Sequence, residues 1–306
     1  MDIVVSTHGL TKRYKDKAVV NQADITVRKG EIYGLVGRNG AGKTTLLRMI
    51  CGLTPISDGT LALFGQGDAK RLTEERRRIG AIIETPSFYP YLSARDNLEY
   101  YRILRGIPEK EVVSQMLNLV GLQDTGKKKF KSFSLGMKQK LGFALAMMGN
   151  PDFLVLDEPT NGLDPMGIIE FRQMLQRISR ERGTTILVSS HILSELSQMA
   201  TCYAFIENGR IIEEVTAKEI AARCRQSVEV QVDDAPRAAA ILENEMDCTD
   251  YEVLNDNRIR VYQYIETPEL ITKGLVLNGV LVQSATTTGV ELESYYMNLV
   301  GGASYA

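Results

Sequence analysis

The chain contains 306 residues, with 36 Lys and Arg against 38 Asp and Glu, which gives a formal net charge of −2. At roughly 150 residues per domain this length predicts about two domains, and the near-neutral charge argues against a general nucleic-acid-binding surface, which needs a basic excess. The four cysteines lack metal-ligand spacing and fit a reducing cytosol. No stretch approaches the roughly 18 to 20 apolar residues that span a bilayer. We therefore expect a cytoplasmic protein.

Residues 1–217 alternate short apolar runs with longer helical patterns. The near-continuous apolar runs, which end in polar residues, are EIYGLVG (31–37), DFLVLDE (152–158) and TTILVSSH (184–191). Such runs are typical of buried parallel strands that have helices on both faces. Helices are predicted at 43–52, which ends at a glycine, and at 134–151, which is bounded by a serine cap and a proline. The order indicates an α/β domain.

The pattern changes after about residue 217. The elements predicted there are a strand at 227–232, a helix at 235–245, a hairpin within 251–262, a helix at 267–279, a strand at 280–287 and a helix within 289–302. This βαββαβα order predicts a small α+β accessory domain over 218–306, separate from the domain over 1–217.

The stretch GRNGAGKTT (37–45) lies between an apolar strand and a helix and matches the pattern G-x-x-x-x-G-K-[ST]. Glycines let backbone N–H groups curl around phosphates, and the start of the helix directs its positive dipole end at the anion. Lys43 would add a positive charge for the β- and γ-phosphates, and the Thr44 hydroxyl suits Mg²⁺. The predicted nucleotide-binding residues of this loop are Gly37, Asn39, Gly40, Gly42, Lys43, Thr44 and Thr45.

Two acids and a histidine end the later apolar runs. Asp157 and Glu158 follow FLVL, and His191 follows TTILVSS. Because open α/β folds bind ligands at the carboxyl edge of the sheet, we expect these side chains to converge on the glycine-rich loop. Asp157 is predicted to hold Mg²⁺, Glu158 to orient and polarise the attacking water, and His191 to hydrogen-bond the γ-phosphate or that water. The candidate catalytic residues are therefore Lys43, Glu158 and His191.

The stretch FSLGMKQKLG (133–142) begins with small and polar residues and then becomes helical. Ser134, Gly136 and the helix N-terminus after them make a second anion-binding element. A head-to-tail dimer would use it, because each copy would then close over the nucleotide of the other. An ordinary capped helix explains the same residues equally well, and spacing alone leaves both interpretations open.

The motifs GRNGAGKT, FSLGM, FLVLDEP and GLDP and the histidine at 191 resemble, in this order, the nucleotide-binding domain of ABC transporters over nearly all of residues 3–217. The resemblance implies a P-loop ATPase domain with a mostly parallel sheet, a helical subdomain and an antiparallel β-subdomain. It implies a homodimer that encloses two ATP molecules, each of them between the P-loop of one copy and the signature of the other. Ser134 and Gly136 then contact the other copy's nucleotide. It also assigns Asp164 to communication across the dimer and Tyr14 to stacking on adenine.

Two departures from the family pattern concern the site. The signature has Leu135 and Met137 at positions where the family's usual LSGGQ has other residues. In AIIETPSFYP, Glu84 stands where the family has Gln, in the loop that reaches Mg²⁺ and links the site to the membrane subunit. Glu84 is therefore an expected Mg²⁺ ligand, together with Thr44 and Asp157. Because a third acid repels the others unless the metal is bound, we expect Mg–ATP to draw this loop in.

The acidic loop, with SFYPYL and FSLGMKQKLG, is similar to the bacitracin-resistance and lantibiotic-immunity exporters, and the C-terminal pattern resembles ATPases of ABC-2-type exporters. This implies an ATP-binding and ATP-hydrolysing subunit, with ATP and Mg²⁺ as cofactors, that powers export of a substrate such as a peptide antibiotic. A separate integral membrane permease would hold it at the inner face of the membrane. The alternative is the ATPase of another ABC class, either a nutrient importer or a soluble protein without a transport role.

A cluster of aromatic residues follows the acidic loop and is open to two interpretations. One is local packing, since aromatic residues are common both in cores and on surfaces. The other, which the family resemblance implies, is a groove that receives a helix of the permease. The cluster consists of Phe88, Tyr89, Tyr91, Tyr100 and Tyr101.

Overall fold

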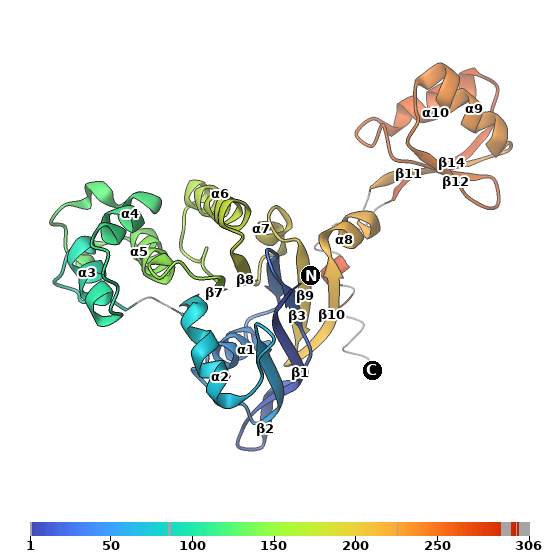
Figure 1. Cartoon of the computed structure of the whole chain (residues 1–306). Helices are drawn as coiled ribbons and strands as arrows, with labels where there is room; N and C mark the ends of the chain where they lie inside the picture. The colour runs from blue at the N-terminus through green and yellow to red at the C-terminus, as the bar shows by residue number, and fades with distance from the viewer. Residues whose placement is uncertain (1, 85–86, 225, 289–294, 298, 300–306) are drawn as a thin grey trace. The chain divides into compact units, whose positions relative to one another are not determined.

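The computed structural model of the chain describes residues 2–84, 87–224, 226–288, 295–297 and 299. The chain divides into two compact units, residues 1–217 and residues 218–306 (Figure 1). The helix expected within 289–302 lies almost entirely outside the described residues. None of the helices in the described part of the chain combines the length and the apolar character that crossing a bilayer requires.

The first unit is built on a six-stranded sheet with the order β10-β9-β4-β8-β7-β6, in which β10 runs antiparallel to β9 and the other pairs are parallel. Its strands are β4 (Ile32–Val36), β6 (Ile79–Ile82), β7 (Phe153–Asp157), β8 (Thr185–Ser190), β9 (Cys202–Glu207) and β10 (Arg210–Thr216). Strands β4, β7 and β8 are buried along their whole length. Their near-continuous apolar sequences follow from this burial, because helices cover both faces of a parallel sheet. The predicted mostly parallel sheet is confirmed.

A smaller antiparallel sheet shares one hydrophobic core with the first sheet. Its strands are β1 (Ile3–Tyr14), β2 (Lys17–Ala23), β3 (Thr26–Arg28) and β5 (Asp58–Leu63). Strand β1 pairs with each of the other three. Helix α1 (Lys43–Ile50) lies in this core, and its leucine, isoleucine and methionine side chains are fully buried. The helix ends at Ile50 rather than at residue 52, because Gly52 turns the chain with a φ of 75° in the left-handed region.

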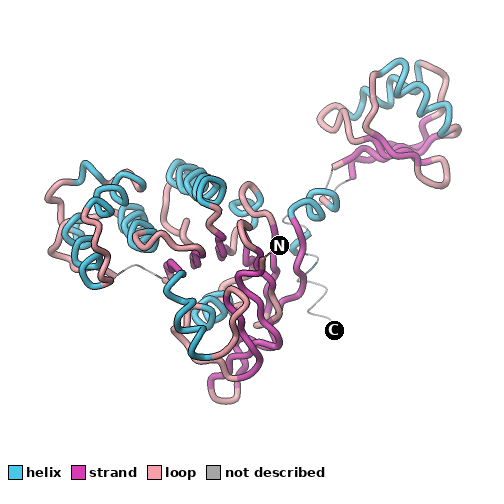
Figure 2. The backbone as a smooth tube through the Cα atoms, viewed as in Figure 1, coloured by secondary structure: helices cyan, strands magenta, loops and turns pink. Residues whose placement is uncertain are grey.

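Six more helices lie in the described part of the first unit. They are α2 (Ala69–Glu75), α3 (Ala94–Leu104), α4 (Glu111–Leu119), α5 (Leu135–Met147), α6 (Pro165–Arg182) and α7 (Leu193–Ser197), with 3₁₀ turns at 76–78, 123–125 and 130–132. Helices α3, α4 and α5 contact one another and form a helical subdomain (Figure 2). Ser134 caps α5 as predicted, since its hydroxyl accepts a hydrogen bond from Met137 N at 3.3 Å. Helix α5 ends at Met147, before the turn in which Asn150 has a φ of 47°.

The second unit has a hydrophobic core of its own. After helix α8 (Ala217–Arg223) come β11 (Ser227–Val232), α9 (Ala235–Met246), β12 (Tyr251–Val253), β13 (Arg258–Val261), α10 (Pro268–Leu277) and β14 (Val282–Thr288). The sheet order is β12-β13-β11-β14 with antiparallel pairs, which is a βαββαβ arrangement of the ferredoxin-like type. The core includes Val230 of β11, Leu242 of α9 and Leu275 of α10, all fully buried.

Candidate nucleotide-binding site

The loop that joins β4 to α1 has a backbone fixed by close contacts. A β-carbon at residue 37 would lie 2.5 Å from the Ile206 carbonyl oxygen, so Gly37 has no room for a side chain. A β-carbon at residue 42 would lie 2.8 Å from the Val19 carbonyl oxygen, and Gly42 also has a φ of 112°, which side chains rarely adopt. The glycines of the motif therefore let the loop curl tightly around the start of α1.

Lys43 is almost completely buried beneath this loop, with 4% of its surface exposed. Its Nζ donates hydrogen bonds to the carbonyl oxygens of Gly37 at 2.6 Å and Arg38 at 3.1 Å. The same Nζ forms an ion pair with Glu158 Oε1 at 3.0 Å. The P-loop lysine and the acid after β7 are thus in direct contact. The other residues predicted for the loop lie in the same segment, with Asn39 and Gly40 exposed and Thr45 half-buried.

Thr44 and Asp157 meet at the carboxyl edge of the parallel sheet. Thr44 Oγ1 donates a hydrogen bond to Asp157 Oδ2 at 2.8 Å. Ser189 Oγ donates to Asp157 Oδ1 at 2.7 Å and accepts a hydrogen bond from Glu158 N at 3.0 Å. Ser189 pairs with Asp157 in the register of β7 and β8. It was not predicted as a site residue, although its place two residues before His191, near the end of a neighbouring strand, was a usable signal.

The Glu158 carboxylate is held by three polar side chains. Oε1 contacts Lys43, while Oε2 accepts a hydrogen bond from Asn161 Nδ2 at 2.7 Å and lies 2.7 Å from His191 Nδ1. Burial raises the pKa of the Glu158 carboxyl, but hydrogen bonds from Lys43, Asn161 and His191 outweigh it and bring the pKa below its ordinary value. Glu158 is therefore an ionised carboxylate at neutral pH. Its φ of 45° is uncommon for a residue with a side chain.

Glu84 has a basic partner that was not predicted. Its carboxylate forms an ion pair with Arg48 Nη2 at 2.6 Å, and the side chains are 59% and 36% exposed, respectively. Arg48 follows Thr44 by one turn of α1, so both side chains lie on the same face of the helix. The structure thus places the Glu84 carboxylate beside Arg48, one helical turn beyond Thr44.

The oxygen atoms at this edge suit Mg²⁺. Thr44 supplies a hydroxyl and Asp157 a carboxylate, and Mg²⁺ prefers such hard oxygen donors. Among the described residues, no group of three or more His, Cys, Asp or Glu could hold a metal ion by itself. Since Mg²⁺ usually binds through one or two carboxylates together with phosphate oxygens, the donor set fits a metal that arrives with a nucleotide.

Comparison with known proteins gives the family. Residues 20–161 match the family model described as ABC transporter. The chain is also 42% identical, over 304 residues that cover 99% of both chains, to the bacitracin transport ATP-binding protein BcrA of Bacillus licheniformis. This chain belongs to the ABC transporter ATP-binding proteins.

Two further similarities agree with this assignment. The lantibiotic transport ATP-binding protein SrtF of Streptococcus pyogenes is 41% identical over 211 residues, which cover 69% of this chain and 90% of SrtF. A dimeric ATP-binding cassette in a post-hydrolysis state, bound to ADP and Pi, superposes with a TM-score of 0.64 at 23% identity and covers 70% of this chain and 98% of that one. The predicted family, P-loop fold and ATPase class are confirmed.

In this ABC ATPase the signature, FSLGM (133–137), and the D-loop, GLDP (162–165), lie together. Ser134, Gly136 and Asp164 line a cavity of about 470 Å³ between α5 and the start of α6. Asp164 caps α6, since its carboxylate accepts a hydrogen bond from Gly167 N at 2.7 Å. The P-loop, Asp157, Glu158 and His191 thus form one hydrogen-bonded group, and Ser134, Gly136 and Asp164 form a second group around the signature. Glu84 contacts Arg48 and belongs to neither group.

Tyr14, predicted to stack on adenine, ends strand β1. Its side chain is 47% exposed, and Lys12 Nζ lies 5.0 Å from the centre of its ring. The role of Tyr14 in stacking on adenine stays a prediction.

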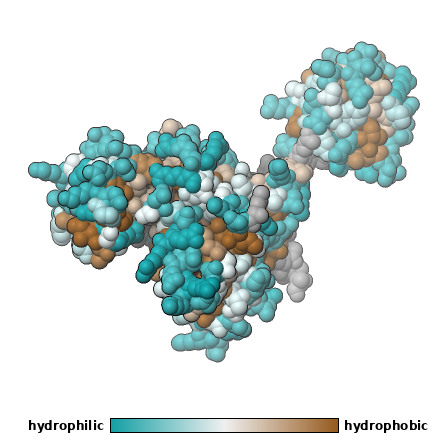
Figure 3. Space-filling view, viewed as in Figure 1, coloured by the Kyte–Doolittle hydropathy of each residue, from teal (hydrophilic) through white to brown (hydrophobic). Residues whose placement is uncertain are grey.

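The aromatic cluster contains both a packed and an exposed part. Phe88 is buried and its ring centre lies 5.7 Å from that of Tyr101. Tyr89 and Tyr100 contact each other at 4.7 Å between ring centres and are 44% and 40% exposed, while Tyr91 is 71% exposed. Hydrophobic side chains continue this surface around α3 (Figure 3). Local packing therefore explains Phe88, whereas the tyrosines offer an accessible aromatic face.

Proposed function

We propose that this ATPase binds ATP and Mg²⁺ at the P-loop and hydrolyses ATP with Glu158 orienting the attacking water. Lys43 and the backbone N–H groups of residues 37–45 would hold the phosphates. Thr44 and Asp157 would hold Mg²⁺, which neutralises charge that develops on the transferred phosphoryl group. The hydrogen bonds that already join Thr44, Asp157 and Ser189 support this assignment, because they preset the positions of the oxygen ligands.

The contact between Lys43 and Glu158 supports a role for Glu158 in the hydrolytic step. The Lys43 ammonium has one carboxylate partner at 3.0 Å, and phosphate oxygens would compete with that carboxylate for the same donor. Glu158 Oε2 would keep its contacts with Asn161 and His191. Oε1 would then be available to accept a hydrogen bond from water, in the ionised form that a general base needs.

We further propose that two copies of the chain close over two nucleotides. Ser134 and Gly136 of one copy would contact the γ-phosphate bound by the other, Asp164 would communicate across the dimer, and Tyr14 would stack on adenine. The N-terminus of α5, where Ser134 is exposed, supports this role, because backbone N–H groups at a helix start attract anions. The dimeric state of the structurally similar cassette supports the same arrangement.

The transport role that we propose is export of a peptide antibiotic, of the bacitracin or lantibiotic type, through a separate integral membrane permease that holds the chain at the inner face of the membrane. One observation carries this proposal. Similarity to the bacitracin transport protein extends over 99% of both chains, whereas similarity to the lantibiotic transport protein covers 69% of this chain. The similarity to the bacitracin protein therefore includes the second unit, residues 218–306, for which we propose an accessory role.

The experiment expresses the chain with a candidate permease, taken from the neighbouring gene, in a bacitracin-sensitive host. We expect the pair to raise the bacitracin concentration that stops growth. Glu158→Gln is the matched control, because it keeps the shape of the side chain and the ability to bind ATP but removes the carboxylate. Resistance that persists in the Glu158→Gln variant contradicts the proposed ATPase mechanism. Unchanged sensitivity to bacitracin and to a lantibiotic, in a pair that hydrolyses ATP, contradicts the proposed substrate class.

A further inference from the structure

Leu135, the unusual residue of the signature, packs directly onto the D-loop of the same chain. A β-carbon on residue 162 would overlap Leu135 Cδ2 and lie 2.9 Å from its Cγ. Gly162 has a φ of 80°, so the D-loop backbone turns there in the left-handed region and comes close against the leucine. The reverse contact is also present, since a β-carbon on Gly136 would lie 3.1 Å from Leu163 Cδ2. The two motifs therefore interlock at two points.

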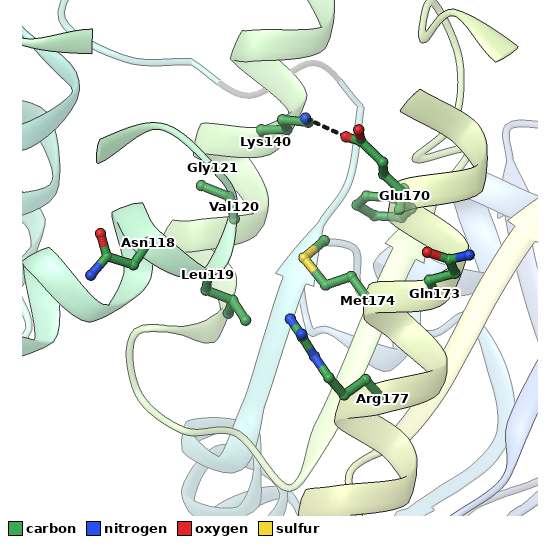
Figure 4. A pocket seen from close by; sticks show the side chains of 10 residues that line it. Asn118, Leu119, Val120, Gly121, Lys140, Glu170, Gln173, Met174 and Arg177 are labelled. Carbon is green, nitrogen blue, oxygen red and sulfur yellow. Dashed lines mark hydrogen bonds and ion pairs between the residues drawn. The ribbon is translucent and has the colours of Figure 1, made fainter. Parts of the chain in front are cut away.

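An ion pair also joins helices α5 and α6. Lys140 of α5 forms an ion pair with Glu170 of α6 at 2.9 Å (Figure 4). Lys140 and Glu170 also line a cavity of about 510 Å³, together with the end of α4 and with Met174 and Arg177 of α6. Helix α5 therefore contacts α6 and the residues before it at two places, the interlocked motifs and this ion pair.

The residue directly before the D-loop is bonded to Glu158. Asn161, directly before Gly162, donates a side-chain hydrogen bond to Glu158 Oε2 at 2.7 Å and a backbone hydrogen bond to the Glu158 carbonyl oxygen at 3.2 Å. A displacement of Gly162 therefore moves the residue that orients the Glu158 carboxylate. Leu135, with 46% of its surface exposed at the face proposed for the second copy, lies at the outer end of this series of contacts.

We propose that Leu135 is a positioning residue that couples the signature to Glu158 of its own chain. The inference rests on the proposed dimer. In that dimer the signature of one copy contacts the nucleotide bound by the other copy. A change in the position of α5 then displaces Leu135 and, through Gly162 and Asn161, the Glu158 carboxylate. Occupation of one nucleotide site then sets the geometry of Glu158 at the other, which makes ATP hydrolysis cooperative.

The test measures ATP hydrolysis by the full chain, with its permease, over a range of ATP concentrations. We compare the unmodified chain with Leu135→Ala, with Leu135→Met as the conservative variant, and with Leu277→Ala as a matched control, because Leu277 is an exposed leucine, 75% accessible, at the end of α10 in the second unit. For Leu135→Ala we expect the Hill coefficient to fall from near 2 towards 1 and kcat to fall at least about fivefold, with KM within about twofold. Leu135→Met should keep both quantities near those of the unmodified chain, and Leu277→Ala should change neither.

A second pair of variants tests the contact itself. In Gly162→Ala the new β-carbon overlaps Leu135, so the loss of activity should be larger in the single variant than in Gly162→Ala combined with Leu135→Ala. Losses that add would overturn the inference. So would a Leu135→Ala variant that behaves like Leu277→Ala, one that changes KM alone, or an unmodified chain that hydrolyses ATP without cooperativity. If the unmodified chain neither dimerises nor hydrolyses ATP, the proposed function fails instead.

Discussion

The pairing of Glu84 with Arg48 leads to a quantitative prediction about Mg²⁺. The carboxylate now lies 2.6 Å from the Arg48 guanidinium, one turn of α1 beyond Thr44. To reach a Mg²⁺ ion held by Thr44 and Asp157, Glu84 must leave Arg48. The outcome depends on whether attraction by the metal exceeds the worth of the ion pair.

The magnitudes favour the metal. An exposed ion pair contributes about 0.2 to 1 kcal/mol, and both side chains here are more than one-third exposed, at 59% for Glu84 and 36% for Arg48. A carboxylate about 4 Å from a divalent ion gains about 2 kcal/mol even at the dielectric constant of water. The net gain is about 1 to 2 kcal/mol, and every 1.4 kcal/mol or so is a tenfold change in an equilibrium constant. Glu84→Gln should therefore raise the Mg²⁺ concentration needed for half-maximal ATP binding by about tenfold.

The assay titrates Mg²⁺ against the binding of a fluorescent ATP analogue and, in parallel, against ATP hydrolysis. Arg48→Met is the matched control, because it removes the same ion pair but leaves the carboxylate free, so its Mg²⁺ midpoint should be unchanged or lower. Both variants should lose less than about 1 kcal/mol of unfolding free energy, which corresponds to a few degrees in melting temperature for a unit of this size. Equal Mg²⁺ midpoints for Glu84→Gln and the unmodified chain would refute the reasoning.

Three further predictions concern the fold. Gly37→Ala should abolish ATP binding and cost about 1 to 3 kcal/mol of stability, measured by urea unfolding, because the new β-carbon lies 2.5 Å from the Ile206 carbonyl oxygen. Leu242→Ala should lower the unfolding free energy of residues 218–306 by about 2 to 5 kcal/mol and leave ATP binding intact. If the two units unfolded in a single shared transition, this prediction would be contradicted. Hydrogen bonds from Arg260 and Arg258 lower the pKa of Glu229. Ionised Glu229 therefore stabilises the folded second unit by up to about 1 kcal/mol above the ordinary Glu pKa of about 4.3, and this stabilisation is lost as the pH falls below that value. Glu229→Gln should remove that dependence in acid titrations of melting temperature.

The parts of the fold that could be predicted are those in which a local pattern has a single physical outcome. The runs before Gly37, Asp157 and His191 are apolar without alternation, and this pattern fits strands covered on both faces. Parallel strands end at one edge, so the sequence also indicated which polar residues gather there. The same reasoning gave the alternating strand and amphipathic helices of the second unit.

The partners of the site residues could not be predicted, because they depend on register and on contacts between distant segments. Ser189 reaches Asp157 only because β7 and β8 pair these two residues, and a shift by one residue would turn the serine to the other face. Arg48 meets Glu84 through a contact between residues 36 positions apart in the sequence, which no local spacing encodes. Leu135 was noted as a departure in the signature, but its contact with Gly162 depends on how α5 sits against the start of α6.

These contacts together explain how weak interactions link distant parts of the chain. From Lys43 the contacts pass to Glu158, from Glu158 to Asn161, and from the adjacent Gly162 to Leu135 at the surface. A hydrogen bond to a charged group contributes about 1.5 to 3 kcal/mol, and coupling between two sites in proteins is of similar size, about 1 to 3 kcal/mol. The free-energy change from losing one bond, such as that between Lys43 and Glu158, is therefore large enough to couple the P-loop to the surface where a second copy would bind. No large rearrangement of either sheet is needed, because all of these contacts lie at Lys43, within the short segment from Glu158 to Gly162 and at the start of α5.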